Sequence, residues 1–177
     1  MSRKPILAVA LLAAGLSHPG FAQQAQREQP QRIGQGTFGS WIAATHNENG
    51  QKVCYAFARA ARSENGPGNR GPVTLTVTHR QAGRDQVAVS VGYAYPRASE
   101  AVLSVGSTEF RSYGVVQSSA FFQNGSQLIA AFRNGRDAVV RSPGPPGRPA
   151  VTDTFPLAGF AAAYDAISRE CPAAARR

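Results

Sequence analysis

The sequence predicts a mainly β protein, folded as an antiparallel β-sandwich with few helices. Three observations lead to this fold class. Short segments of alternating apolar and polar residues recur along the chain, turn-forming Gly and Asn residues separate them, and only two segments carry apolar residues at helical spacing. Several short strands with regular turns between them are typical of sandwiches.

The chain begins with the pattern of a secretory signal, over residues 1–22. Arg3 and Lys4 precede an apolar run from about Pro5 to Leu16, and Gly20-Phe21-Ala22 places small residues where a signal peptidase cuts. The run is shorter than the ~20 residues that span a bilayer, so an uncleaved membrane anchor is the weaker alternative. We therefore predict a periplasmic location, with secretion or outer-membrane association as alternatives.

One folded domain is expected after the signal. Residues 23–32 are polar and Gln-rich, and we expect a disordered leader because such a segment cannot offset its ordering entropy. A single β-sandwich domain is predicted over residues 33–171, followed by a flexible tail over residues 172–177. No segment after the signal is long and apolar enough to be transmembrane.

Alternating patterns define the expected strands, and Asn49-Gly50 is a strong hairpin signal between the first two. Five large aromatics could form an exposed binding strip, but we expect most of them in the core: Trp41, Tyr55, Phe57, Tyr93 and Phe110. The expected strands are Thr37–Thr45, Lys52–Ala60, Pro72–Arg80, Gln86–Gly92, Ala101–Val105, Glu109–Tyr113 and Asp137–Ser142.

Two helices are predicted. Ser126–Asn134 is a short helix with Ser126 as its N-cap and Gly135 just beyond its end. The second runs over Leu157–Glu170, and between the two helices Pro143–Pro149 should form an exposed, polyproline-like loop. The second helix is amphipathic and should pack one stripe on the sheets, formed by Leu157, Phe160, Ala163, Tyr164, Ile167 and Cys171.

After removal of the signal, Cys54 and Cys171 are the two cysteines of the chain. No His or Cys lies at metal-ligand spacing to either, and an exported protein meets an oxidising environment, so a disulfide is favoured over a metal site or a redox pair. It would close a loop of about 117 residues and stabilise the fold by at most ~4–5 kcal/mol.

The chain is basic, with 19 Lys and Arg residues against 10 Asp and Glu. Nearly all the basic residues are Arg, whose planar fork matches phosphate and carboxylate. Possible partners are lipopolysaccharide phosphates, peptidoglycan carboxylates and sialylated host surfaces, whereas export disfavours nucleic acid. GC-rich coding would also explain the charge. The candidate polyanion-binding residues are Arg59, Arg62, Arg70, Arg80, Arg84 and Arg97.

No catalytic constellation stands out. His46 and His79 are the histidines after the signal, and either could serve as a base beside a Ser, but no nucleophile motif accompanies them. The carboxylates include no close pair. We predict no catalytic residue, no metal and no cofactor. A hydrolase of envelope polymers is the weakest hypothesis, and a pocket joining His46 or His79 to a Ser and a carboxylate would favour it.

Three segments, in their order and spacing, resemble a known family. Lys52–Ala56, shortly after Trp41, resembles a K-x-C-Y/F segment, and Val87–Tyr93 resembles a V-S-V-x-x-G-Y stretch. The end of the chain resembles T-D-x-F/Y-S-L-x-G-F/L followed by A-x-x-x-I-x-x-E-C, through Thr152–Phe160, Ala163, Ile167 and Glu170-Cys171. Together they resemble the invasion-associated locus B proteins, over most of residues 36–171.

This resemblance implies an exported envelope protein with an immunoglobulin-like sandwich and a C-terminal helix, and it brings no enzyme activity. We therefore expect a non-enzymatic protein that binds at the cell envelope or at a host-cell surface. The alternative is a periplasmic folding or assembly helper that adds a strand to an exposed sheet edge. The oligomeric state and the partner's identity are not predicted.

Overall fold

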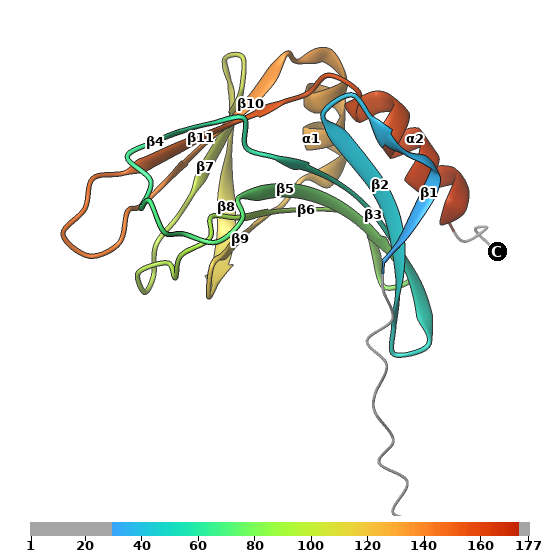
Figure 1. Cartoon of the computed structure of the whole chain (residues 1–177), viewed down its shortest axis with the longest axis horizontal. Helices are drawn as coiled ribbons and strands as arrows, with labels where there is room; N and C mark the ends of the chain where they lie inside the picture. Colours follow the sequence, from blue (N-terminus) through green and yellow to red (C-terminus); the bar gives the residue numbers. More distant parts are fainter. Residues whose placement is uncertain (1–29, 174–177) are drawn as a thin grey trace, which may run out of the picture.

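The computed structural model describes residues 30–173, so the signal, most of the leader and the end of the tail lie outside the described residues (Figure 1). The helices are α1 (Gly125–Asn134) and α2 (Phe160–Glu170). The strands are β1 (Gln31–Phe38), β2 (Trp41–Glu48), β3 (Gln51–Arg59), β4 (Arg62–Glu64), β5 (Thr74–Arg80), β6 (Gly83–Ser90), β7 (Val102–Val105), β8 (Thr108–Val116), β9 (Ser119–Phe122), β10 (Asp137–Ser142) and β11 (Val151–Pro156).

All the strands pair antiparallel in one 11-stranded sheet, in the order β1-β2-β3-β5-β6-β9-β8-β7-β10-β11-β4. The sheet bends into two layers at β8, which pairs with β7 through its first half and with β9 through its second half. We call the layer from β1 to β9 sheet A and the layer from β7 to β4 sheet B. The predicted antiparallel sandwich is confirmed, and its two layers are continuous through one shared strand.

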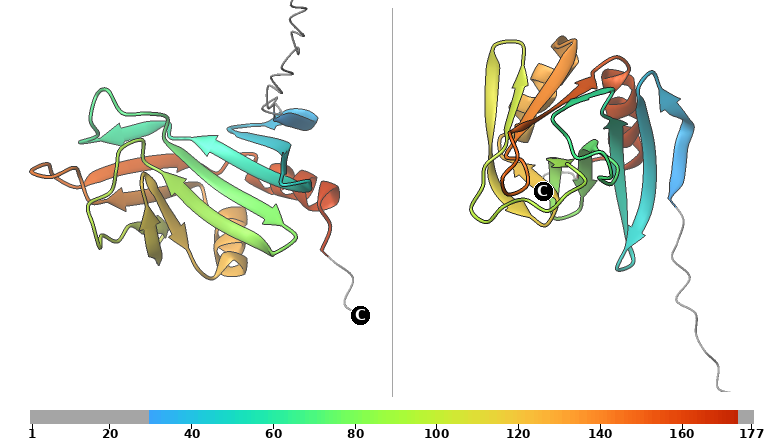
Figure 2. Two further views of the ribbon diagram at one scale, coloured as in Figure 1. Left: turned by 90° about the horizontal axis from the view of Figure 1, so that it is seen from below. Right: turned by 60° about the vertical axis from the view of Figure 1, so that its left-hand side comes forward.

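The core lies between the inner faces of the two sheets, and the helices close one end of it (Figures 1 and 2). Alternation along β3 sends Cys54, Ala56 and Ala58 inward. Helix α2 packs on β1, β2 and β3. Its Phe160 ring lies 4.8 Å from the ring of Trp41, which is fully buried and donates a hydrogen bond of 3.0 Å to the carbonyl of Pro156.

Two features near the N-terminus differ from the sequence-based prediction. The expected strand Thr37–Thr45 is divided, because Gly39 has a φ of +56° and turns the chain between β1 and β2. Strand β1 also begins at Gln31, inside the predicted leader. Gln31 and Arg32 pair with Thr45 and Ala44 of β2, and such backbone pairing needs no apolar side chain.

The helix ends also differ. Asn124, in a left-handed conformation and without a side-chain hydrogen bond, occupies the N-cap of α1, so Ser126 is not the cap. Helix α2 begins at Phe160 rather than Leu157. Its N-cap, Gly159, has a φ of +91°, and a Cβ there would lie 1.9 Å from the carbonyl oxygen of Phe38. The close approach of the β1–β2 turn therefore fixes where α2 starts.

Candidate binding site

Three long loops meet at the end of the sandwich opposite α2, on the left of Figure 1. They comprise residues 65–73, 91–101 and 143–150, and we call this region the loop end. Hydrogen bonds tie each loop to another. The Gly71 N–H donates to the Gly92 carbonyl over 2.9 Å, and the Asn65 amide donates to the Ala150 carbonyl over 3.2 Å. The loops thus form one cross-linked surface.

A buried ion pair lies beneath these loops. The Asp153 side chain, on β11, is fully buried, and the Arg70 side chain is 8% exposed. Arg70 binds the carboxylate through both terminal nitrogens, with Nη1 3.1 Å from Oδ2, and it also donates to Ser63 on β4 and to the Val91 carbonyl. One guanidinium therefore joins β4, β11 and two of the loops.

Two tyrosines support the second loop. The Tyr93 hydroxyl donates to the Pro143 carbonyl over 2.8 Å, and the Tyr95 hydroxyl lies 2.8 Å from Ser142 Oγ. Burial raises the pKa of Tyr93 to about 12, with the Asp153 charge adding to the effect, and burial likewise raises the pKa of Tyr95 to about 12. Both hydroxyls remain protonated and hydrogen-bonded near neutral pH.

Two hollows open at the loop end and share Gly71 in their walls. The first has a volume of 460 Å³ and is lined by polar groups that include Arg59, Ser63, Asn65 and Arg70. The second has a volume of 500 Å³ and lies between the first two loops and the turn that joins β8 to β9. Gly92 is required at their junction, because its φ is +75° and a Cβ would lie 2.2 Å from the Gly71 carbonyl oxygen.

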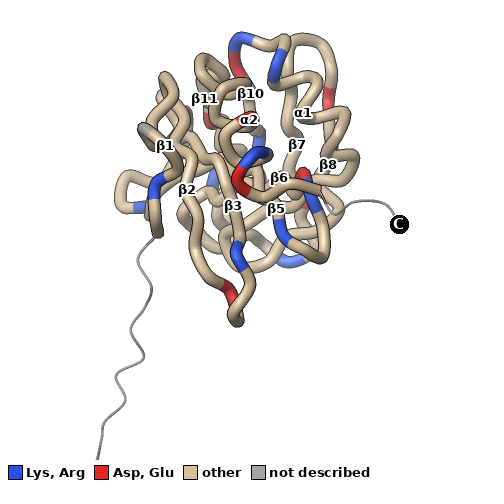
Figure 3. The backbone as a smooth tube through the Cα atoms, turned by 90° about the vertical axis from the view of Figure 1, so that its right-hand side faces the viewer, with Lys and Arg blue, Asp and Glu red and all other residues tan. Residues whose placement is uncertain are grey.

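The structure divides the six candidate arginines between the two ends of the molecule. Arg59, Arg70 and Arg97 lie at the loop end, and Arg62 lies on β4, which leads into the first loop. Arg80 and Arg84 lie around the β5–β6 turn, at the opposite end of β5. Arg80 is paired with Glu48 over 2.7 Å. On the side seen in Figure 3, basic and acidic positions are interspersed.

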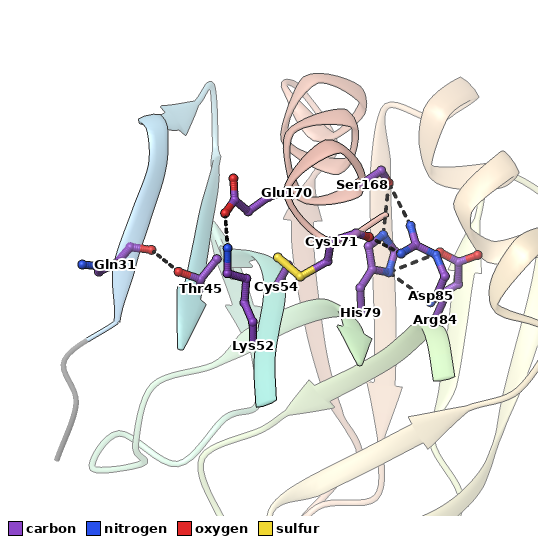
Figure 4. The surroundings of a disulfide bond; sticks show 10 residues. All are labelled: Gln31, Thr45, Lys52, Cys54, His79, Arg84, Asp85, Ser168, Glu170 and Cys171. Carbon is purple, nitrogen blue, oxygen red and sulfur yellow. Dashed lines mark hydrogen bonds and ion pairs between the residues drawn. A yellow bond between two sulfur atoms is a disulfide. The ribbon is translucent and has the colours of Figure 1, made fainter. Parts of the chain in front are cut away.

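Cys54 and Cys171 form a disulfide beside the β5–β6 turn, with their Cα atoms 6.0 Å apart (Figure 4). Cys54 is fully buried on β3, opposite His79 of β5, and Cys171 follows the last residue of α2. Arg84 donates to the Cys171 carbonyl and Lys52 pairs with Glu170, so polar contacts also hold the end of α2 against the sheet. We call this region the disulfide end.

A cluster that sequence reasoning missed lies beside the disulfide (Figure 4). His79 is fully buried, and its Nε2 lies 3.1 Å from Ser168 Oγ on α2. Its Nδ1 lies 3.7 Å from Asp85 Oδ1, which accepts a hydrogen bond of 2.7 Å from the Tyr164 hydroxyl. Ser168, His79 and Asp85 are the residue types of a Ser-His-Asp hydrolase. A pocket that joins them would favour the hydrolase of envelope polymers, the weakest of the hypotheses drawn from the sequence.

One hydrogen bond favours a tautomer of this histidine that is unsuited to a general base. The Asp85 backbone N–H donates to Nδ1 over 3.3 Å, which favours the tautomer with its proton on Nε2, the nitrogen that faces Ser168. Nε2 cannot then take a proton from the serine. Ser168 is also not among the residues that line the neighbouring hollow of 220 Å³. The cluster is best explained as a polar contact between α2 and β5.

His46 lies apart from this cluster. Its ring packs edge-on against Tyr55, with the ring centres 5.4 Å apart. Within residues 30–173, no group of three or more His, Cys, Asp or Glu side chains is placed to hold a metal ion.

Both edges of the sheet are unsuited to strand addition. β4 has only three residues. The pairing of β1 with β2 shifts register between Arg32 and Thr37, where Gly34 and Gly36 have positive φ. Very short or bulged edge strands protect a sheet against pairing with another chain. The geometry therefore gives no support to the assembly-helper alternative.

The fold and these sites define a disulfide-closed antiparallel β-sandwich with a basic hollow built from loops. Residues 41–168 match the family model described as Invasion associated locus B (IalB) protein. The match covers more than half of the chain, and the chain belongs to this family. The resemblance drawn from the sequence is thus confirmed.

A solved structure has a similar fold. The crystal structure of invasion associated protein B from Bartonella henselae aligns with a TM-score of 0.52 at 20% sequence identity, over 81% of this chain and 97% of that chain. The comparison with curated proteins found no significant match. Neither helix of the described part is long and apolar enough to cross a membrane.

Proposed function

We propose that this protein is exported and acts in the bacterial envelope by binding an acidic component through its loop end, without catalysing a reaction. The signal pattern of residues 1–22 supports export. So does the disulfide, because such bonds persist in oxidising compartments. The tautomer of His79 argues against catalysis at the Ser-His-Asp cluster.

The Arg59-lined hollow is the observation that carries this proposal. Arg70, in its floor, is neutralised by Asp153, whereas Arg59 is exposed. Arg62 and Arg97 are also exposed. Loops on a rigid β scaffold commonly carry binding residues. An exposed guanidinium beside polar groups binds phosphate or carboxylate.

The proposed ligand is a phosphate- or carboxylate-bearing envelope polymer, with lipopolysaccharide as the test case. The family and the Bartonella relative carry names that refer to invasion. An acidic host-cell surface is therefore the other source of such groups, and the experiment separates the two with lipopolysaccharide and sialylated membrane vesicles as probes.

A triple variant, Arg59→Ser/Arg62→Ser/Arg97→Ser, tests the loop end. A control with the same loss of charge is Arg133→Ser/Arg136→Ser/Arg169→Ser, at exposed positions away from the loop end. Binding is measured at low and high salt. We expect wild type and control to bind and to weaken steeply with salt, because exposed charges are screened within ~8 Å at physiological ionic strength. Equal binding by both variants would reject a site at the loop end.

A further inference from the structure

The outer face of sheet A carries an apolar band that crosses its strands. In register, Ile42 of β2 lies beside Phe57 of β3, then Thr76 of β5, Ala88 of β6 and Phe121 of β9. Helices α1 and α2 and sheet B lie on the other side, and no described element covers this face; β5 and β6 lie open in the left view of Figure 2.

The prediction that most large aromatics are buried holds for Trp41 and Phe110, but Tyr55 and Phe57 point outward and are half-buried.

Aromatic rings stand at both margins of this band. On β3, the Tyr55 and Phe57 rings are stacked, with centres 6.0 Å apart and planes within 24°, and His46 packs against Tyr55. On the far side, Tyr113 packs against Phe121 with ring centres 6.4 Å apart. Tyr113 is 63% exposed and Val116 is 62% exposed, and these are the most exposed large apolar side chains in the described part of the chain.

Hydroxyl groups fill the space between the two sets of rings. Alternation along β5 turns Thr74 and Thr76 outward, whereas Thr78, on the same side, is buried. Ser90 pairs in register with Thr74, and Ser119 pairs with Ser90. The face therefore presents aromatic rings, then a strip of hydroxyls, then aromatic rings again. A ligand that matches it has flat apolar surfaces and many hydroxyls, which is the chemistry of a sugar chain. C–H groups of a sugar carry partial positive charge and are attracted to the negative face of an aromatic ring.

The charge of this face favours acidic sugar chains over neutral ones. Glu48, at the tip of the β2–β3 hairpin, supplies the carboxylate among the described outward side chains of sheet A. Arg80 neutralises the charge of Glu48. Arg32 and Arg59 are exposed at the margins. A second copy of the chain would bring these cations against one another. A membrane is a poor match because, except for Tyr113 and Val116, the apolar side chains are recessed.

We propose that the outer face of sheet A is a docking platform for an acidic glycan, a chain of sugar rings that carries carboxylates or phosphates. The rings of Tyr55, Phe57, Phe121 and Tyr113 stack on the sugars, the Thr hydroxyls bind their hydroxyls, and the marginal arginines bind the acidic groups. This site lies on a different face from the hollow at the loop end and shares Arg59 with it.

The test uses Tyr55→Leu/Phe57→Leu, which keeps the apolar area but removes the rings. The control is Val102→Ala/Val139→Ala on the outer face of sheet B, where both side chains are also half-buried. Affinities are measured for hyaluronate and polygalacturonate as acidic glycans, dextran as a neutral glycan, polyphosphate as a polyanion without rings, and phosphatidylglycerol vesicles. The emission of fully buried Trp41 reports whether each variant is folded.

We expect wild type and control to bind an acidic glycan more tightly than dextran, and the ring variant to bind it at least about tenfold more weakly, with polyphosphate binding unchanged. Failure of both acidic glycans to bind, or unchanged binding by the ring variant, would overturn the proposal. A parallel loss of polyphosphate binding would assign the effect to charge alone, and ring-dependent binding to vesicles without glycan binding would assign the face to lipid. Both outcomes overturn the proposal as well. Because Arg59 belongs to both sites, the double variant Arg62→Ser/Arg97→Ser reports on the loop end alone.

Discussion

The disulfide end and the loop end of the sandwich are held together by different interactions. At the disulfide end, a covalent bond joins β3 to the end of α2, and His79, Arg84 and Ser168 add polar contacts between sheet and helix. At the loop end, the buried pair of Arg70 and Asp153 joins β4, β11 and two loops. The disulfide end is closed by packing and a covalent bridge, while the loop end keeps its hollows open above a buried ion pair and hydrogen bonds between loops.

This difference suggests a division of labour. Helix α2 and the disulfide fix the core without using the loops, so the loop end can carry binding groups at little cost to the fold. The same reasoning identifies the weak point of the loop end. If Arg70 and Asp153 are the main link among the loops, then breaking this pair should affect the loop end more than opening the disulfide affects the other end.

The largest effect is expected for Arg70→Met. It leaves the fully buried Asp153 carboxylate without its cation, and breaking one partner of a buried pair typically costs about 3–5 kcal/mol of unfolding free energy. Urea unfolding measures the loss, and hydrogen exchange should show the loops of residues 65–73 and 91–101 opening first. The double variant Arg70→Met/Asp153→Leu is the control, and it should recover most of the loss because no buried charge remains. A double variant as unstable as the single one would show that the ion pair itself, and not the isolated charge, matters.

The next effect is expected for Cys54→Ala/Cys171→Ala. The disulfide closes a loop over a sequence separation of 117 residues, and its removal should lower the unfolding free energy by about 2–4 kcal/mol. Because α2 keeps its packed stripe of Phe160, Ala163, Ala166 and Ile167, we expect a folded protein with a lower melting temperature. Thiol titration of denatured, unreduced wild type should find no free thiol. Two titratable thiols per chain would contradict the pairing.

Much of this arrangement could be predicted from the sequence, because it depends on local patterns. Alternation predicted strands at Lys52–Ala60 and Pro72–Arg80, which contain most of β3 and all of β5, and the spacing of Phe160, Ala163 and Ile167 predicted the packed face of α2. Strand β4 has only three residues, too few for a periodic pattern to appear. Gly39 interrupts the apparent strand Thr37–Thr45 because the turn must fit against Ala158, which is distant in sequence.

The sites depended on contacts that no local pattern encodes. Arg59, Arg70 and Arg80 look alike in the sequence, yet one is exposed at a hollow, one is buried against Asp153, and one is paired with Glu48. The partners of Arg70 and His79 lie 83 and 89 residues away. An isolated His and Ser gave no signal, because their meeting depends on α2 crossing the end of β5.

The smallest effect on stability is expected at the disulfide end, from the protonation of His79. Burial, together with the nearby Arg84 charge, lowers the pKa of His79 below its ordinary value, while Asp85 acts in the opposite direction. The folded protein therefore holds this ring neutral, whereas the unfolded chain protonates it below about pH 6.5. Above that pH the histidine contributes nothing to the pH dependence. As the pH falls through 6.5 towards the lowered pKa, the unfolded state binds the proton first, and stability is lost.

We therefore expect the melting temperature of wild type to fall between pH 7.5 and pH 5, before the carboxylates titrate. His79→Gln should be less stable at pH 7.5, since it loses the edge-on contact with Tyr164, but its melting temperature should change less over this range. His46→Gln is the matched control, because His46 is half-buried on the outer face of β2, away from the cluster. It should keep the wild-type pH dependence. Parallel curves for wild type and His79→Gln would mean that the buried ring is not what makes the disulfide end sensitive to acid.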